Sequence, residues 1–189
     1  MNETGLSSAP QPSPASGAVT IRTATPGDRD GILEVVEQAF SSKDRDATEE
    51  LDIVLSTWTL QATVAELELV AIGDGAVVGH VMAGRGDLGG HEVVAIAPLA
   101  VRPRHQGLGI GSALMTELLR RAEQAALPLV VLLGLPAYYG RFGFEASGPL
   151  GISYRPVGDG NPHFQVRRFA GYDPSYRGDF TYCWEAQPN

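Results

Sequence analysis

The stretch VAIAPLAVRPRHQGLGIGSALM, residues 94–115, decides the fold of this chain. It begins inside an apolar run, 93–101, that predicts a buried strand. A basic turn and a glycine-rich segment, 106–112, follow, and the segment leads directly into a helical pattern. A glycine-rich loop that opens a helix leaves backbone N–H groups unpaired at the positive end of the helix dipole. The stretch therefore predicts an anion site that suits a pyrophosphate.

Two common phosphate-binding loops fit these residues poorly. A nucleoside triphosphatase loop needs GxxxxGK[ST], and no lysine lies near Gly111. A dinucleotide fingerprint needs GxGxxG close behind a strand, but here Gly107 and Gly109 are followed by Ser112, and residues 102–106 separate the strand from the first glycine. The next predicted strand also ends without an acidic residue. Neither an NTPase nor a dinucleotide site is favoured.

Composition limits the class of protein. The 189 residues, 43% hydrophobic and 19% charged, predict one globular domain. A formal net charge of -8 argues against general nucleic-acid binding, because phosphate backbones require a basic face. Cys183 is the only cysteine, so an intrachain disulfide and a cysteine-based zinc site are excluded, and no metal site is expected. With no apolar run near the ~20 residues that span a bilayer, we expect a cytoplasmic protein without membrane contact.

The hydrophobic periodicity predicts a mixed α/β domain with a central sheet, spanning residues 18–189 after a disordered tail at 1–17. A strand at 19–22 precedes two helices, the first capped by Thr25 and the second beginning at Asp46. The later expected elements are a hairpin of 67–72 and 76–83, a glycine-rich turn at 84–90, a strand at 92–101, a helix from 110, a buried strand at 127–133, a short helix at 136–142, a strand from Gly143, and late strands at 164–169 and 181–184.

Two motifs at the correct spacing indicate a family. The segment Gln106-x-x-Gly109-x-Gly111 matches a Q/R-x-x-G-x-G/A loop, and Tyr139 with Gly143-Phe144 matches Y-x-x-x-G-F. In these motifs the chain resembles the GNAT superfamily of acyl-CoA N-acetyltransferases. The segments Gly79-His80-Val81 and 164–184 are similar to its YhbS-like branch, which implies a C-terminal strand extension from about residue 145.

The resemblance implies a GNAT-like fold whose central sheet splays open after Val101, with acetyl-CoA as co-substrate in the gap. The pantetheine arm would pair with the strand backbone, and the N–H groups of the loop would bind the pyrophosphate. Arg104 and His105 would either add charge near the 3′-phosphate or form a solvated turn. The residues implied to bind the cofactor are Leu99, Ala100, Val101, Gln106, Gly107, Leu108, Gly109, Ile110, Gly111, Ser112, Tyr139 and Phe142.

The resemblance also implies catalytic roles. Tyr139 would give a proton to the departing thiolate, while Tyr138 is expected to face elsewhere and pack. The N–H near Leu99 would stabilise the oxyanion, a role that Pro98 cannot fill because it has no N–H.

The general base is less clear from the sequence. Many relatives place a glutamate on the strand before the loop, where this chain has Ala97 and Pro98. His80 is the candidate base, with His91 and Glu92 behind it. A water chain, or an amine that arrives neutral, would also serve.

These inferences predict an enzyme that transfers acetyl from acetyl-CoA to a primary amine by direct attack on the thioester. Transfer of another short acyl group, transfer to a hydroxyl or thiol, and a non-catalytic acyl-CoA sensor are the alternatives. The acidic stretches 44–50 and Glu66/Glu68 form a solvated face or steer a cationic amine. By analogy with relatives, a homodimer is possible.

Overall fold

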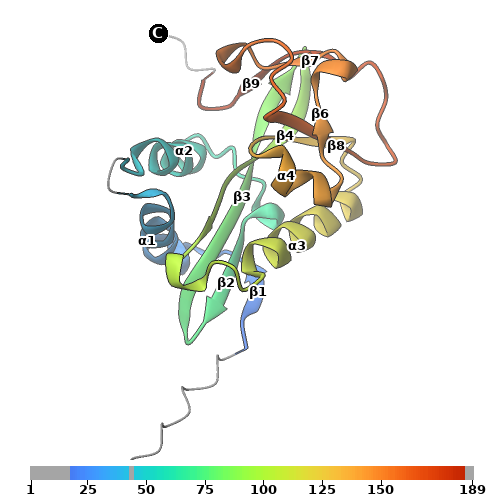
Figure 1. The fold of residues 1–189 in the computed structure, drawn as a ribbon. Coiled ribbons are helices and arrows are strands. Elements are labelled where there is room, and N and C mark those ends of the chain that lie inside the picture. The colour runs from blue at the N-terminus through green and yellow to red at the C-terminus, as the bar shows by residue number, and fades with distance from the viewer. Residues whose placement is uncertain (1–17, 43–44, 186–189) are drawn as a thin grey trace, which may run out of the picture.

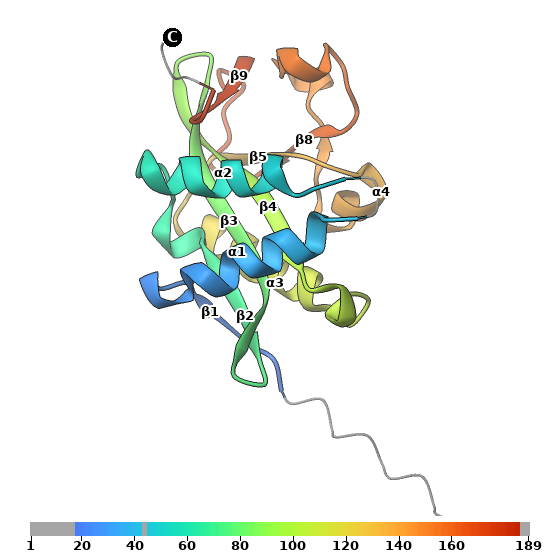
Figure 2. The ribbon, with the colours of Figure 1, turned by 90° about the vertical axis from the view of Figure 1, so that its left-hand side faces the viewer.

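The computed structural model describes residues 18–42 and 45–185, so the tail at 1–17 and Asp44 lie outside the described residues. It confirms the expected mixed α/β fold. Helices α1 (Arg29–Phe40) and α2 (Thr48–Thr59) cover one face of a twisted sheet, and α3 (Ile110–Gln124) covers the other (Figures 1 and 2). The strands are β1 (Thr20–Thr23), β2 (Leu69–Gly73), β3 (Ala76–Leu88), β4 (His91–Val101), β5 (Leu129–Leu133), β6 (Glu145–Ala146), β7 (Ile152–Ser153), β8 (Phe164–Arg168) and β9 (Gly178–Tyr182).

The strand order across the sheet is β1-β2-β3-β4-β5-β8-β6, and β9 pairs with both β3 and β7. Two glycines show how closely the helices approach the sheet. A Cβ on Gly31 of α1 would lie 2.9 Å from Val77, and a Cβ on Gly79 of β3 would lie 3.0 Å from Ile110 of α3. Both helices therefore pack against β3, from opposite faces.

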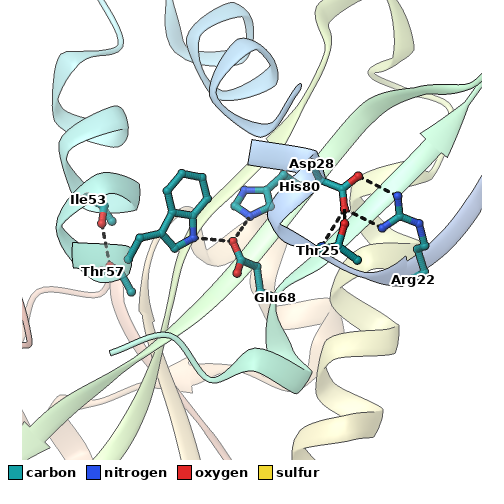
Figure 3. A network of polar contacts seen from close by, with 8 residues as sticks. Arg22, Thr25, Asp28, Ile53, Thr57, Glu68 and His80 are labelled. Atoms are coloured by element: carbon teal, nitrogen blue, oxygen red, sulfur yellow. Dashed lines mark hydrogen bonds and ion pairs between the residues drawn. The ribbon is translucent and has the colours of Figure 1, made fainter. Parts of the chain in front are cut away.

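Hydrogen bonds connect the start of the first helix to β1, near the predicted N-cap. Asp28 Oδ2 accepts hydrogen bonds from both the backbone N–H and the hydroxyl of Thr25, each at 2.7 Å. Arg22 of β1 donates to both carboxylate oxygens of Asp28 at 2.7 Å (Figure 3). Arg22 and the Thr25 groups together hold the pKa of Asp28 well below its usual range despite burial.

The glycine-rich segment 84–90, expected to be a turn, is mostly strand. β3 continues to Leu88, and the turn is confined to Gly89 and Gly90, which have positive φ angles of +57° and +90°. Gly86 serves close packing instead, because a Cβ there would lie 2.7 Å from the ring of Phe180 in β9. The prediction was wrong because glycine marks both turns and close backbone approaches.

The C-terminal extension folds back over the far end of the β3–β4 hairpin (Figure 1). β9 begins at Gly178, earlier than the strand expected at 181, and pairs with Gly86–Leu88 of β3. Its aromatic side chains form a second core with residues of β4, β5 and β8. The extension thereby closes one end of the molecule beside α2.

The sheet opens between β4 and β5. These parallel strands pair only through Val94 with Val130 and Ala95 with Val131. Beyond Ala95 they diverge, and the short helix α4 (Pro136–Tyr139) follows β5 on the far side of the opening (Figure 1). None of the helices in the described parts of the chain has the length and hydrophobicity needed to cross a bilayer.

Candidate active site

A cleft of about 1610 Å³ occupies the opening between β4 and β5. One wall is the β4 segment 96–101 with the following loop, and the opposite wall is the segment 133–135 with α4. Leu133 and Leu135 are 44% and 65% exposed, which leaves apolar surface on that wall for a ligand. The cleft continues over α2 and ends at the C-terminal extension.

The β4 backbone faces the cleft at Leu99. Arg102 N–H donates to Val78 O at 2.9 Å, so the hydrogen-bonded pairs of this antiparallel ladder include His80 with Ala100. Leu99 is the neighbour of Ala100 and occupies the alternate, non-hydrogen-bonded position opposite Val81, so it directs its N–H and C=O away from β3, toward the opening. Ala100 is bonded to β3 and does not line the cleft, which differs from its expected role in binding cofactor.

A β-bulge shapes this stretch of β4. Val81 of β3 is opposite Leu99, but Ala83 is opposite Ile96, so β4 carries one extra residue between these pairs. Ala97 and Pro98 occupy the bulge and line the cleft. The bulge therefore lies where the strands part.

The glycine loop presents free amides at the start of α3. Gly109 caps the helix with a φ of +83°, and the first bond within the helix runs from Ala113 N–H to Gly109 O at 2.9 Å. The N–H groups of Ile110, Gly111 and Ser112 consequently have no acceptor within the helix. All three residues line the cleft, as expected for an anion site.

Side chains of the basic turn and Gln106 fix the loop. Gln106 Nε2 donates to Val101 O at 3.0 Å, which holds the loop against the end of β4. Arg102 is buried and pairs with Glu34 of α1 at 2.9 Å, so its role is structural. Of the two remaining basic residues, His105 lines the cleft and Arg104 does not.

Tyr139 lies on the wall opposite Leu99. Its ring packs against Phe144, with the ring centroids 5.9 Å apart, and borders the main core. Burial, with a smaller effect of Tyr138, raises the pKa of Tyr139 to about 12. The hydroxyl therefore keeps its proton throughout the neutral and mildly alkaline range.

Tyr138 also faces the cleft, whereas the sequence predicted that it would point elsewhere. A Cβ on Gly111 would lie 2.9 Å from the Tyr138 hydroxyl, which places that hydroxyl at the glycine loop. The guanidinium of Arg141 lies 4.0 Å from the centre of the Tyr138 ring, and Arg141 also donates to Ser112 at 3.1 Å. The last two residues of one short helix thus both reach the site.

The structure does not bring the candidate base His80 to the cleft. His80 is completely buried in β3, and its Nε2 is 3.3 Å from Glu68 Oε1 (Figure 3). Trp58 of α2 donates to the same carboxylate oxygen at 2.9 Å. His91 and Glu92 lie near the hairpin turn, where His91 contacts Tyr176, and neither lines the cleft.

Two further expected cofactor residues also lie outside the cleft lining. Leu108 is 65% exposed and projects from the loop, although the neighbouring Gly107 lines the cleft. Phe142 lines a second pocket of about 440 Å³ between α3, the segment 141–143 that follows α4, and the end of β8. Arg141 lines both spaces and connects them.

The far end of the cleft has acidic side chains, three of them from the stretch 44–50, which was expected to form a solvated face or to steer a cationic amine, and aromatic side chains that the sequence did not place there. The acidic residues come from the segment that begins α2 and from the C-terminus, while the aromatic residues come mostly from the extension. These residues are Phe40, Asp46, Glu49, Glu50, Asp52, Tyr154, Tyr182, Trp184 and Glu185. His105 and Arg141 lie beside the glycine loop, so the cleft has one end with free amides and basic side chains and one acidic end.

This chain belongs to the acetyltransferase (GNAT) family, whose model matches residues 31–144. It is 35% identical to the uncharacterized N-acetyltransferase YhbS of Escherichia coli K12 over 79% of this chain and 87% of that protein. The uncharacterized N-acetyltransferase YjhQ of the same strain is 31% identical over 67% of this chain and 69% of that protein. The family predicted from the two motifs is confirmed.

Solved structures agree with this assignment. The crystal structure of E. coli YhbS in complex with CoA matches with a TM-score of 0.78 and 31% identity, covering 91% of this chain and 93% of that one. A GNAT family acetyltransferase from Brucella melitensis, in complex with acetyl-CoA, matches with a TM-score of 0.72 and 32% identity, covering 87% of this chain and 96% of that one.

Proposed function

We propose that this protein transfers the acetyl group of acetyl-CoA to a primary amine, by direct attack of the amine on the thioester. The observation that carries the proposal is the opening between β4 and β5, with free amides of α3 at one end and the Leu99 N–H along its wall. The complexes of its relatives with CoA and acetyl-CoA support the choice of co-substrate.

The cofactor end of the cleft fits a diphosphate. The amides of Ile110, Gly111 and Ser112 bind its oxygens at the positive end of the α3 dipole. Arg141 lies beside Ser112 and adds a positive charge that can bind a phosphate in either pocket. The pantetheine arm pairs with the free edge of β4, as an added strand would, against the apolar wall of Leu133 and Leu135.

The reacting carbonyl is held by the bulged segment of β4. Leu99 N–H donates to the thioester oxygen, and this bond strengthens as the oxygen gains negative charge. The nitrogen–carbon bond forms, the carbon–sulfur bond breaks, and the amine proton leaves to water. His80 is enclosed by the core and does not reach the cleft, so it does not take that proton.

Tyr139 donates a proton to the departing sulfur. With a pKa of about 12, its hydroxyl is fully protonated when the thiolate forms. The same burial raises the pKa of the thiol from its usual value near ~8.5, which reduces the mismatch between donor and acceptor. Tyr139 then recovers its proton from solvent.

A thiol-release assay with acetyl-CoA tests the proposal. Release that depends on an added primary amine, with the acetylated amine found by mass spectrometry, supports it. Among the described residues, the β4 segment Ala97-Pro98-Leu99 at the opening carries no titratable side chain, which favours one rival, an acyl-CoA sensor. Tight binding of acetyl-CoA without any amine-dependent release would establish that rival, and faster release from a longer acyl-CoA would replace acetyl as the transferred group.

A further inference from the structure

We propose that the acceptor is a small aliphatic diamine, whose second, protonated nitrogen is held by carboxylates at the acidic end of the cleft. The proposal rests on the proposed function and specifies its substrate class. The acidic end comprises Glu49, Glu50 and Asp52 of α2 facing Trp184 and Glu185 of the C-terminal extension.

The two sides of the acidic end lie close together. Tyr154, on the extension, donates its hydroxyl to Glu185. Burial and the Glu185 carboxylate raise the pKa of Tyr154, and the Glu49 carboxylate adds to this effect. Negative charge from α2 and from the extension therefore acts on the same small volume.

Glu50 is the strongest single indication of a cationic ligand. The residue is only 8% exposed, and its Oε1 is paired with Arg45. Its Oε2 is buried and accepts no hydrogen bond from any residue in 18–42 or 45–185. A buried carboxylate oxygen without a donor is unfavourable, and a ligand ammonium group supplies the missing donor.

The charge at this end is better explained by a second nitrogen than by the reacting one. The reacting amine must be neutral when it attacks, and nearby carboxylates favour its protonated form. Asp46, Glu49, Glu50, Asp52 and Glu185 all line this end, and among the described lining residues only Arg45 there carries positive charge. A second ammonium group matches this excess and leaves the first nitrogen free to react.

The aromatic side of the pocket suits a short alkyl chain. Trp184 stacks on Tyr182, with ring centroids 4.3 Å apart and an angle of 17° between the planes. Tyr182 and Tyr154 are both mostly buried and both line the cleft. Aromatic rings pack against methylene groups and attract a cation to the ring face. The alkyl chain between two nitrogens would lie against these rings.

The test compares three acceptors of similar length with the purified full chain in the thiol-release assay: butanediamine, butylamine and γ-aminobutanoate. We expect kcat/KM for butanediamine to exceed that for butylamine by roughly tenfold or more, because charge-assisted hydrogen bonds are the strong ones. γ-Aminobutanoate, whose second group is negative, is expected to be the poorest acceptor. The preference for butanediamine should decrease as salt is added.

Two variants test whether the preference for butanediamine depends on the acidic end of the cleft. Glu50→Gln and the exposed Asp52→Asn are each expected to lower the butanediamine-to-butylamine ratio at least severalfold. The control, Glu37→Gln, removes the same charge from exposed α1 surface outside the cleft and should leave the ratio unchanged. Asp52 is on the surface, so its variant remains informative if Glu50→Gln fails to fold.

The possible failures can be separated. Calorimetry that detects no acetyl-CoA binding overturns the proposed function, and the diamine inference with it. Two outcomes overturn the diamine inference alone, provided that acetyl-CoA binds. In one, kcat/KM for butylamine equals or exceeds that for butanediamine. In the other, the protein acetylates none of the three acceptors. An unchanged ratio in both Glu50→Gln and Asp52→Asn also overturns it.

Discussion

The ring of Tyr139 lies directly against the Cα of Gly134, so that a Cβ atom on Gly134 would be only 2.2 Å from Tyr139 Cε2. Gly134 is in turn fixed at the end of β5. Its N–H donates to His163 O at 2.8 Å, and its carbonyl accepts from Gln165 at 2.9 Å. The position of the proposed proton donor is therefore set by a glycine that cannot easily move.

Gly134→Ala should lower kcat by roughly tenfold or more, because the new methyl group displaces the Tyr139 ring from its place beside the reacting sulfur. The comparison is Gly140→Ala, since a Cβ there meets nothing within 4 Å and the backbone is helical with a φ of -55°. Steady-state kinetics of both variants measures the effect. Equal turnover by the two would show that the Gly134 contact does not position Tyr139.

Tyr139→Phe removes only the hydroxyl and should lower kcat by roughly 100-fold, the usual scale of a lost general acid. Affinity for acetyl-CoA should change little, because the ring and its packing remain. Tyr172→Phe is the matched control, since Tyr172 does not line the cleft. If Tyr139→Phe keeps full turnover with an accepted amine, Tyr139 is a packing residue only.

The pH dependence should reflect the raised pKa of Tyr139. An ordinary tyrosine loses its proton near pH 10.0, whereas the Tyr139 pKa is about 12. Because the protonated form is the active one and a raised pKa extends its range, activity should persist as pH rises through 10. A decline of kcat centred at or below pH 10 that is absent in Tyr139→Phe would contradict the raised pKa of Tyr139.

Asp28→Asn tests the attachment of α1 to β1. The variant loses the negative charge that pairs with Arg22 and keeps only one acceptor oxygen for Arg22 and Thr25, so it should lower the free energy of unfolding by about 1–3 kcal/mol at neutral pH. Since the native pKa lies below the ordinary value of 3.8, this stabilisation is present above that pH and is lost as pH falls further. Urea unfolding at neutral and acidic pH measures it, with the exposed Asp30→Asn as control. A difference between Asp28→Asn and the native chain that does not shrink in acid would refute it.

Much of the cofactor end could be predicted from the sequence because it is local. The strand, the glycine loop and the helix that follows are contiguous, and Gly109 and Gly111 mark the anion site without reference to the rest of the fold. Motif spacing alone predicts Tyr139 as a site residue, and Tyr139 lines the cleft. Tyr138 was misjudged, since the turn after β5 orients α4 so that both tyrosines face the cleft.

The acidic end could not be predicted in the same way. Glu50 and Trp184 are far apart in the sequence, and they share a pocket because β9 pairs with β3 and places the following residues 183–185 near α2. The sequence offers His80 as the base because it lies on the preceding strand, but the structure buries it beside Glu68, which also accepts a hydrogen bond from Trp58 of α2. Long-range pairing decides both outcomes, and sequence periodicity does not encode it.

Calorimetric titration of the full chain with acetyl-CoA, run beside Gly111→Val, tests the central claim most directly. Gly111 has an ordinary φ, and its missing Cβ would face the Tyr138 hydroxyl at 2.9 Å, so valine obstructs the diphosphate site without backbone strain. Gly171→Val, on the exposed surface, is the control. We expect the native chain and the control to bind acetyl-CoA with micromolar or tighter affinity, and folded Gly111→Val not to bind it. No binding by the native chain, or equal binding by all three proteins, would contradict the assignment of the glycine loop as the diphosphate site.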